Sequence, residues 1–179
     1  MLIVMAGLPG TGKSTLSRAL AERSGGIVLD KDVIRAALFA PAQVEYSRRQ
    51  DDFCQRIMLQ TAEYLLSHNH GLRVFLDGRP FSRVYQRRQV EAAAARMRAP
   101  LAIIECVCPE SLALARLRAD SAGGAHPAAN RGPSLYARVK AEFEALSESR
   151  VTIDTGQRLA ECVKQAEAYL QRVIGWAGS

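Results

Sequence analysis

Short apolar runs alternate with longer amphipathic segments along the 179 residues of the chain. Runs of aliphatic residues bounded by polar or turn-forming residues predict buried β-strands. They cover residues 2–6, 27–29, 73–76, 101–107 and 151–153. Apolar residues at helical spacing predict helices over residues 13–23, 31–38, 44–68, 82–98, 109–119, 134–147 and 157–173. Strands that alternate with helices indicate an α/β fold, in which a parallel sheet is covered by helices on both faces.

One segment breaks this alternation. Residues 121–133 are small, rich in glycine and proline, and poor in apolar bulk, which predicts a mobile loop. The loop is either a linker without a chemical role or part of a lid over a bound ligand, for which we take residues 119–133. Arg116, Arg118 and Arg131 lie before and inside it and favour the lid. The length of the chain predicts a single domain over residues 1–179.

The most specific motif follows the first apolar run. Residues 7–14 read G-L-P-G-T-G-K-S, a complete G-x-x-x-x-G-K-S sequence between a predicted strand and a predicted helix. In this context glycines let the backbone N–H groups surround phosphates, and the start of the helix adds positive potential. We therefore expect the chain to bind a nucleoside triphosphate with Mg²⁺. The residues expected to hold the nucleotide are Gly7, Pro9, Gly10, Thr11, Gly12, Lys13, Ser14 and Thr15, with Lys13 on the β- and γ-phosphates and Ser14 on the metal ion.

Charged residues follow the second strand. Asp32 and Arg35 are three residues apart and project from one side of the first turn of a helix. Phosphoryl transfer requires a carboxylate that orients the attacking hydroxyl group and a cation that holds the acceptor, and these two residues fit both roles. Asp30 precedes the helix and is expected to cap it. The alternative for Asp32 is an electrostatic role at the positive end of the helix.

The third strand ends at Asp77, where the carboxyl ends of parallel strands meet. An acidic residue at this point is typical of Mg²⁺ binding beside a phosphate-binding loop, or of contact with the acceptor. The alternative is a solvated carboxylate that caps the next helix, but Ser82 is better placed for that role. Arg79 and Arg83 follow Asp77 and are expected to flank the acceptor.

Composition narrows the classes of partner. The net charge is +6, the isoelectric point is near 9.5, and 20 of the 24 basic residues are arginines. This bias suits phosphate binding, but the arginines are dispersed and only 6% of residues are aromatic, so the charge does not by itself indicate nucleic acid. Four cysteines without metal-ligand spacing are expected to be buried and reduced. The chain contains no candidate membrane span, and its apolar start leads into the glycine loop rather than a signal cleavage site, so we expect a cytoplasmic protein.

The ordered motifs resemble a known family. They are G-L-P-G-T-G-K-S-T, D-K-D-V-I-R, V-F-L-D-G-R-P-F-S-R, C-P-E-S-L-A-L-A-R-L-R, S-L-Y-A-R-V-K-A-E-F-E and V-T-I-D-T-G. Together they resemble the small P-loop kinases of the adenylate kinase, gluconate kinase and polynucleotide kinase group, and most closely the compact proteins of the AAA-family ATPase or predicted kinase type. The resemblance implies a three-layer P-loop NTPase fold with a five-stranded parallel sheet of order 2-3-1-4-5 and a small lid.

The resemblance also implies roles for single residues. Arg116 would contact the phosphates of ATP or stack on adenine, and Arg118 and Arg131 would be lid arginines. Thr155 and Gly156 would lie at the edge of adenine. Asp32 and Arg35 match the Asp-x-x-Arg of 5′-hydroxyl polynucleotide kinases. The chain departs from the pattern at Asp120, where relatives often have a second lid arginine.

The leading hypothesis is an ATP-dependent phosphotransferase that acts on a hydroxyl group of a small molecule. Its catalytic residues would be Lys13, Asp32, Arg35 and Arg116. The second hypothesis is a 5′-hydroxyl polynucleotide kinase, which would bind a nucleic acid 5′-end. The third is a nucleotide-dependent ATPase or switch without an acceptor. The acceptor pocket is expected to be formed by residues 32–50 and 78–88 and the lid, whose side chains allow a sugar, an antibiotic, a nucleoside or a 5′-terminus. No sequence feature indicates an oligomeric state.

Overall fold

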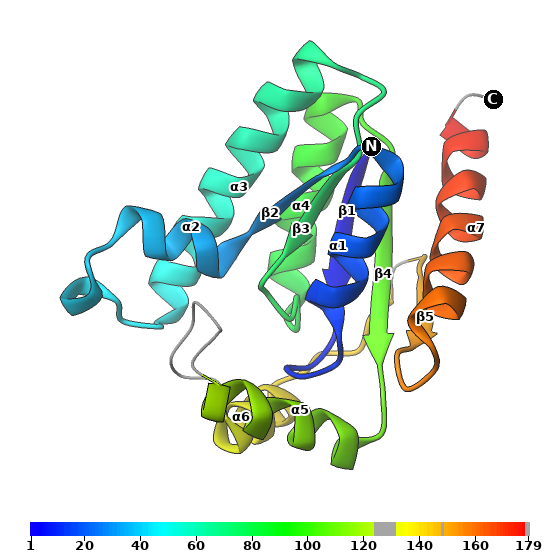
Figure 1. Cartoon of the computed structure of the whole chain (residues 1–179). Coiled ribbons are helices and arrows are strands. Elements are labelled where there is room, and N and C mark those ends of the chain that lie inside the picture. Colours follow the sequence, from blue (N-terminus) through cyan, green and yellow to red (C-terminus); the bar gives the residue numbers. More distant parts are fainter. Residues whose placement is uncertain (124–131, 148, 178–179) are drawn as a thin grey trace.

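The computed structural model describes residues 1–123, 132–147 and 149–177. A five-stranded sheet lies at its centre (Figure 1). The strands are β1 (Leu2–Ala6), β2 (Ile27–Asp30), β3 (Val74–Asp77), β4 (Leu101–Val107) and β5 (Val151–Asp154). Their order is β2-β3-β1-β4-β5 and every neighbouring pair is parallel. The predicted fold class and strand order are therefore confirmed.

The helices form a layer on each face of the sheet (Figure 1). Their bounds are α1 (Lys13–Ser24), α2 (Lys31–Leu38), α3 (Arg48–His68), α4 (Val84–Met97), α5 (Glu110–Gly123), α6 (Pro133–Ala141) and α7 (Leu159–Ala177), with a short 3₁₀ helix η1 at Pro41–Gln43. Helices α1 and α7 cover one face, and α3 and α4 cover the other. Helices α5 and α6 lie beyond the carboxyl ends of the strands.

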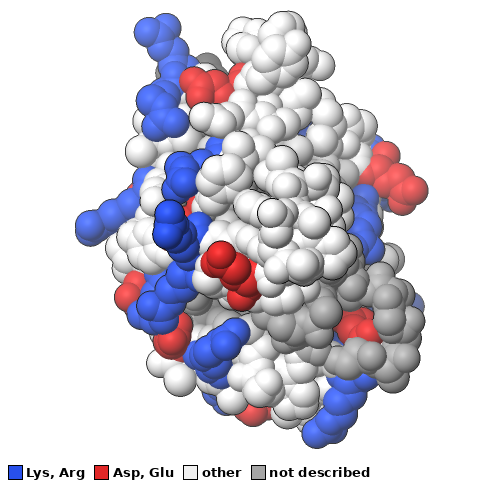
Figure 2. Space-filling view, turned by 90° about the vertical axis from the view of Figure 1, so that its left-hand side faces the viewer, with Lys and Arg blue, Asp and Glu red and all other residues white. Residues whose placement is uncertain are grey.

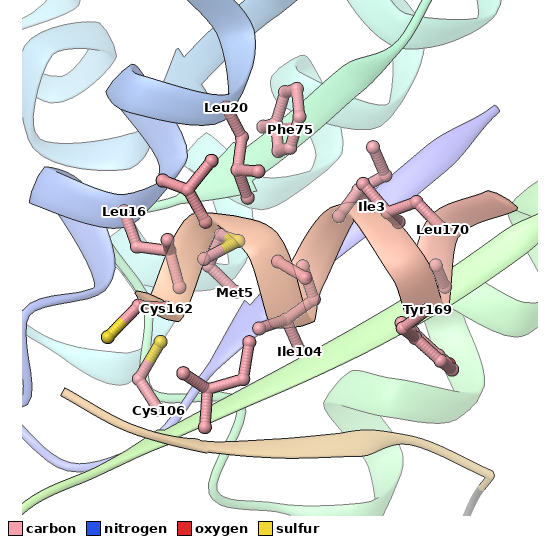
Figure 3. Close-up of a cluster of buried hydrophobic side chains, with 14 of the residues drawn as sticks. Ile3, Met5, Leu16, Leu20, Phe75, Ile104, Cys106, Cys162, Tyr169 and Leu170 are labelled. Atoms are coloured by element: carbon pink, nitrogen blue, oxygen red, sulfur yellow. The ribbon is translucent and has the colours of Figure 1, made fainter. Parts of the chain in front are cut away.

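Strand β1 supplies side chains to both cores because successive residues of a strand point to opposite faces. Ile3 and Met5 belong to the core beneath α1 and α7, which Figure 3 shows with Leu16 and Leu170. Leu2 and Val4 belong to the core beneath α3 and α4. A central strand buried on both faces must be continuously apolar, which explains the uninterrupted run at the start of the sequence.

A third, smaller core joins α5 and α6. Ala113, Leu117 and Tyr136 are buried there, and Leu8 from the glycine loop packs against them. The pair of helices is therefore attached to the loop by apolar contacts. Among the residues that the structure describes, no helix combines the length and apolar character needed to cross a membrane.

The ends of several elements differ from the predictions. Helix α3 begins at Arg48 rather than at residue 44, because the Ser47 hydroxyl caps it by accepting the Gln50 N–H at 3.2 Å. Helix α5 extends through residues 121–123, which were expected in the loop, and α6 ends at Ala141 rather than at residue 147.

The expected cap at Ser82 is wrong. Helix α4 begins at Val84, and the Val84 N–H donates to the carboxylate of Glu144 at 2.5 Å. This acceptor comes from the segment after α6, sixty residues further along the chain. That segment is also held by Arg87, whose guanidinium donates to the carbonyl groups of Glu144 and Ala145 at 3.4 and 3.0 Å.

Candidate active site

The glycine loop connects β1 to α1 at the carboxyl edge of the sheet. Gly7, Gly10 and Gly12 have φ values of +128°, +77° and +75°, a region that residues with a Cβ rarely adopt. A Cβ on Gly7 would lie 2.3 Å from the carbonyl oxygen of Cys106, and one on Gly10 would lie 2.5 Å from that of Ala113. The loop therefore requires these glycines both for its backbone conformation and for its close packing.

Two polar side chains of the loop fold back on it. Lys13 Nζ donates to the carbonyl oxygens of Gly7 and Leu8 at 2.8 and 2.7 Å. The Thr11 hydroxyl donates to the Leu8 carbonyl at 2.7 Å, and its side chain is buried. Thr11 therefore supports the loop from within, whereas Lys13 lines a cavity of about 710 Å³ together with Pro9, Gly10, Gly12, Ser14 and Thr15.

Arg116 lies between this cavity and a second one of about 380 Å³ and lines both. Its guanidinium donates to the Thr155 carbonyl at 2.9 Å, to the Thr155 hydroxyl at 3.2 Å and to the Gly10 carbonyl at 3.5 Å. The structure thus brings together Arg116, Thr155 and the loop, which the sequence separates by up to 145 residues. Gly156 follows Thr155 and donates its N–H to the Asp154 carboxylate at 2.8 Å, outside the lining of either cavity.

The structure describes Arg118 but not Arg131, the other predicted lid arginine. Arg118 is exposed and lines neither cavity. Arg131, with most of the segment 119–133, lies outside the described residues. The lining from this side of the larger cavity comes instead from α5 and α6, through Arg116, Asp120, Leu135, Arg138 and Val139.

Asp32 and Arg35 lie at the opposite end of the larger cavity, at the start of α2. The predicted cap is confirmed, because the Asp30 carboxylate accepts the N–H groups of Asp32 and Val33 at 2.8 and 3.4 Å. With Asp30 in that role, the Asp32 carboxylate accepts instead from Arg35 Nη1 at 2.6 Å. The second Arg35 nitrogen, Nη2, donates to Asp51 of α3.

Asp77 ends β3 beside the loop and is fully buried. One of its oxygens, Oδ2, accepts from the Ser17 hydroxyl at 3.2 Å. The other, Oδ1, is buried and has no hydrogen-bond partner among the described residues. An unpaired buried carboxylate oxygen is costly unless a cation or a donor satisfies it, so this position fits a Mg²⁺ ion or one of its water ligands.

Ser14 lies one helical turn before Ser17 on α1 and lines the larger cavity. In the part of the chain that the structure describes, no group of three or more His, Cys, Asp and Glu side chains is arranged to hold a metal ion. A divalent cation at this point would therefore depend on Ser14, Asp77 and the oxygens of a bound phosphate, as a hard cation with few protein ligands commonly does.

The structure gives Arg79 a role in packing. Its side chain is 2% exposed, and the guanidinium donates to Gln55 Oε1 at 2.6 Å, Asp52 Oδ1 at 2.5 Å and the Tyr85 hydroxyl at 3.3 Å. These bonds attach the segment after β3 to α3 and α4, although Arg79 also reaches the wall of the cavity. Arg83 lines the cavity and pairs with Glu142 at 2.9 Å and with Glu144 at 3.5 Å.

Tyr46 and Arg48 line the cavity and belong to the segment 32–50 that was expected around the acceptor. Lys31, Asp51 and Glu142 also line it and were not predicted. Asp51 lies in the first turn of α3, where an acidic residue is favoured by the helix dipole. Because this local role accounts for an aspartate at that position, nothing in the sequence indicated that Asp51 lines the cavity. Tyr46 has a φ of +51°, which is uncommon for a residue with a side chain, and lies against the guanidinium of Arg35.

The sheet order, the glycine loop and the buried aspartate define a P-loop NTPase fold of the kinase type. The family model described as an AAA domain matches residues 2–146, and the chain belongs to this family. No curated protein matches the sequence.

Solved structures share the fold, among them the following three. A candidate kinase from Chloroflexus aurantiacus is 24% identical, with a TM-score of 0.74 over 94% of this chain and 97% of that one. A gluconokinase from Sinorhizobium meliloti is 21% identical, with a TM-score of 0.68 over 96% and 91%. Kti12 from Chaetomium thermophilum, in complex with ADP-AlF3, is 14% identical, with a TM-score of 0.71 over 98% of both chains.

Proposed function

We propose that the protein is an ATP-dependent kinase that transfers the γ-phosphoryl group to a hydroxyl group of a small molecule. The observation that carries this proposal is that one cavity contains both Lys13 of the glycine loop and the Asp32 carboxylate, which Arg35 holds. A nucleotide-hydrolysing switch needs the first group but has no evident use for the second. The similarity of the fold to a gluconokinase supports the same class of reaction.

The nucleotide would extend from the larger cavity, which would hold its phosphates, into the smaller one. The loop amides and Lys13 would bind the β- and γ-phosphates, and Arg116 would contact the phosphates from the other side. The smaller cavity, beside Thr155, would hold the nucleoside. Ser14 and Asp77 would hold Mg²⁺, which supplies positive charge to the transferring phosphoryl group when it is bound.

Asp32 would accept the proton of the attacking hydroxyl group or hold that group in line with the γ-phosphorus. A carboxylate is a weak base, but orientation of the nucleophile matters more than early deprotonation in a loose phosphoryl-transfer transition state. Arg35 fixes the Asp32 carboxylate through an ion pair of 2.6 Å. Residues 1–179 would form a single domain, with the segment 119–133 as a lid that excludes water.

ADP release from Mg-ATP tests the proposal. The acceptor panel should contain sugars, sugar acids, nucleosides, aminoglycosides, chloramphenicol and a 5′-hydroxyl oligonucleotide. We expect at least one small molecule to stimulate turnover, and Asp32→Ala to reduce the stimulated rate at least about 100-fold while the affinity for ATP stays near that of the native protein. Glu63→Gln, on the outer face of α3, is the control.

Two other outcomes would each identify another function. Stimulation by the oligonucleotide alone would indicate a 5′-hydroxyl polynucleotide kinase, which the Asp-x-x-Arg sequence favours. Figure 2 shows basic side chains gathered in a band on one side of this face, with acidic side chains along its edges. Against a nucleic acid stands the low aromatic content of 6%, which offers few side chains on which bases could stack. Slow ATP hydrolysis that ignores every acceptor and survives Asp32→Ala would indicate an ATPase or switch, and the proposal would then be wrong.

A further inference from the structure

Arg35 joins two carboxylates at the acceptor end of the larger cavity. Its side chain is 3% exposed, and it donates to Oδ1 of Asp32 on α2 and to Oδ1 of Asp51 on α3. Lys31 lies beside it, with Nζ 2.9 Å from Asp51 Oδ1 and 3.4 Å from Asp32 Oδ1. Two buried cations therefore hold two carboxylates side by side, and all four residues line the cavity.

Each of these carboxylates has a second oxygen available. Both cations contact Oδ1 of Asp32 and Oδ1 of Asp51, and no described residue donates to Oδ2 of either. These Oδ2 atoms are not among the buried unpaired atoms, and the Asp51 side chain is 24% exposed. The cavity thus contains two neighbouring acceptor groups that a ligand with two hydrogen-bond donors can engage together.

Five cations that line the cavity pair with carboxylates: Lys31 and Arg35 with Asp32 and Asp51, Arg79 with Asp52, Arg48 with Glu142, and Arg83 with Glu142 and Glu144. Arg18 of α1 and Arg138 of α6 also line the cavity. An anionic group on the acceptor would have to displace a carboxylate to reach any of the five paired cations. Such an exchange leaves a carboxylate unpaired, and the cost is largest at the buried Arg35.

The phosphate end of the cavity has a different arrangement. Among the described residues, the guanidinium of Arg116 donates to neutral oxygens of Gly10 and Thr155 and to no carboxylate. A phosphate that takes over such donors displaces no carboxylate. The two ends of one cavity are therefore suited to ligands of different charge.

We propose that the acceptor is an uncharged or cationic compound with at least two neighbouring hydroxyl or amino groups, such as a polyol, a sugar or an amino sugar. This inference rests on the proposed kinase function. Asp32 binds the hydroxyl group that reacts, and Asp51 binds the second donor. The acceptor oxygen forms a bond to the γ-phosphorus, the bond from that phosphorus to the β–γ bridging oxygen breaks, and ADP leaves; the hydroxyl proton passes to Asp32 and then to solvent.

Matched acceptors test the charge of the substrate. ADP release from Mg-ATP is measured with D-glucose, myo-inositol and kanamycin, and with D-gluconate and a 5′-hydroxyl oligonucleotide. We expect stimulation by at least one of the first three and a kcat/KM at least about 10-fold lower for the anionic compounds. Asp32-dependent stimulation by D-gluconate and by none of the first three would overturn this inference and leave the proposed function intact. Stimulation by the oligonucleotide alone, or by no compound of this set or of the wider panel, would overturn both.

Asp51→Asn tests the second carboxylate, with Glu63→Gln on the same helix as control. We expect KM for the stimulating acceptor to rise at least about 10-fold, kcat to change less than about 3-fold, and the Kd for Mg-ATP, measured by titration, to stay unchanged. Selectivity should also shift toward D-gluconate, because one negative charge is removed. An unchanged KM with an unchanged Kd for Mg-ATP would overturn the role of Asp51, and a reduced kcat at unchanged KM would do the same.

Discussion

Asp30 and Asp77 are partners at the last register position of β2 and β3. Burial raises the pKa of Asp30, and the charge of Asp77 raises that pKa further. Gly78 makes this proximity feasible, since a Cβ there would lie 2.7 Å from Asp30 Oδ1. The carboxyl edge of the sheet therefore carries concentrated negative charge beside the loop, which is favourable for a divalent cation and costly without one.

Replacement of Asp30 by asparagine should relieve this repulsion. Asparagine caps helices as well as aspartate does, so we expect Asp30→Asn to raise the free energy of unfolding at pH 7 by roughly 0.5–1 kcal/mol. Because the pKa of Asp30 is higher in the folded state than in the unfolded state, protonation of Asp30 favours folding. This contribution to stability is complete below the unfolded-state pKa and is lost as the pH rises through the folded-state pKa. The gain from the substitution should accordingly vanish as the pH falls toward about 4. Urea unfolding at several pH values measures it, and a gain that persists at pH 3 would contradict this account.

Gly7 and Gly25 form a matched pair for the glycine loop. Both have positive φ, but a Cβ on Gly25 meets nothing within 4 Å, whereas one on Gly7 meets the Cys106 carbonyl. We expect Gly25→Ala to cost roughly 1 kcal/mol of stability and to leave ATP affinity unchanged. Gly7→Ala should cost about 2–4 kcal/mol and abolish ATP binding, because the loop must move away from β4. Thermal unfolding and nucleotide titration distinguish the two, and equal losses in both variants would show that the contact is unimportant.

Arg79 provides a test of packing against acceptor binding. Its guanidinium bonds to Asp52, Gln55 and Tyr85, so Arg79→Ala should lower the free energy of unfolding by about 3–5 kcal/mol. Arg88→Ala, at an exposed position of the same region, should change it by less than about 0.5 kcal/mol. If Arg79→Ala keeps native stability and only raises the KM of an acceptor, Arg79 holds the acceptor as the sequence first suggested.

The four cysteines should differ in reactivity. Burial raises the pKa of the Cys106 thiol to about 12, and it also raises the pKa values of Cys54 and Cys162. All three are buried, whereas Cys108 is partly exposed. Since the thiolate is the reactive form, iodoacetamide at pH 8 should label Cys108 alone in the native protein and all four after denaturation. Peptide mass spectrometry measures the labelling, and modification of Cys106 before unfolding would contradict the burial.

The sequence was sufficient for the sheet, the glycine loop and the cap at Asp30, because each depends on neighbouring residues or on a pattern of fixed period. It was insufficient where a side chain finds its partner far along the chain. Glu144 caps α4 from sixty residues away, so Ser82 was the best local choice and was wrong. The pairing of Asp51 with Arg35 likewise depends on how α3 packs against α2, and neither residue signals the other.

Leu8 is a variable position of the loop motif, yet its side chain packs into the small core of Ala113, Leu117 and Tyr136. Thr11 and Lys13 also bond to its carbonyl oxygen. Apolar packing of the Leu8 side chain and hydrogen bonds to its carbonyl oxygen therefore hold the phosphate-binding loop in place in the absence of nucleotide. Little conformational freedom of the loop remains to be lost when a nucleotide binds. A polar residue in place of Leu8 would increase the conformational freedom of the free loop. It would weaken nucleotide affinity through entropy alone, because no contact to the ligand is removed.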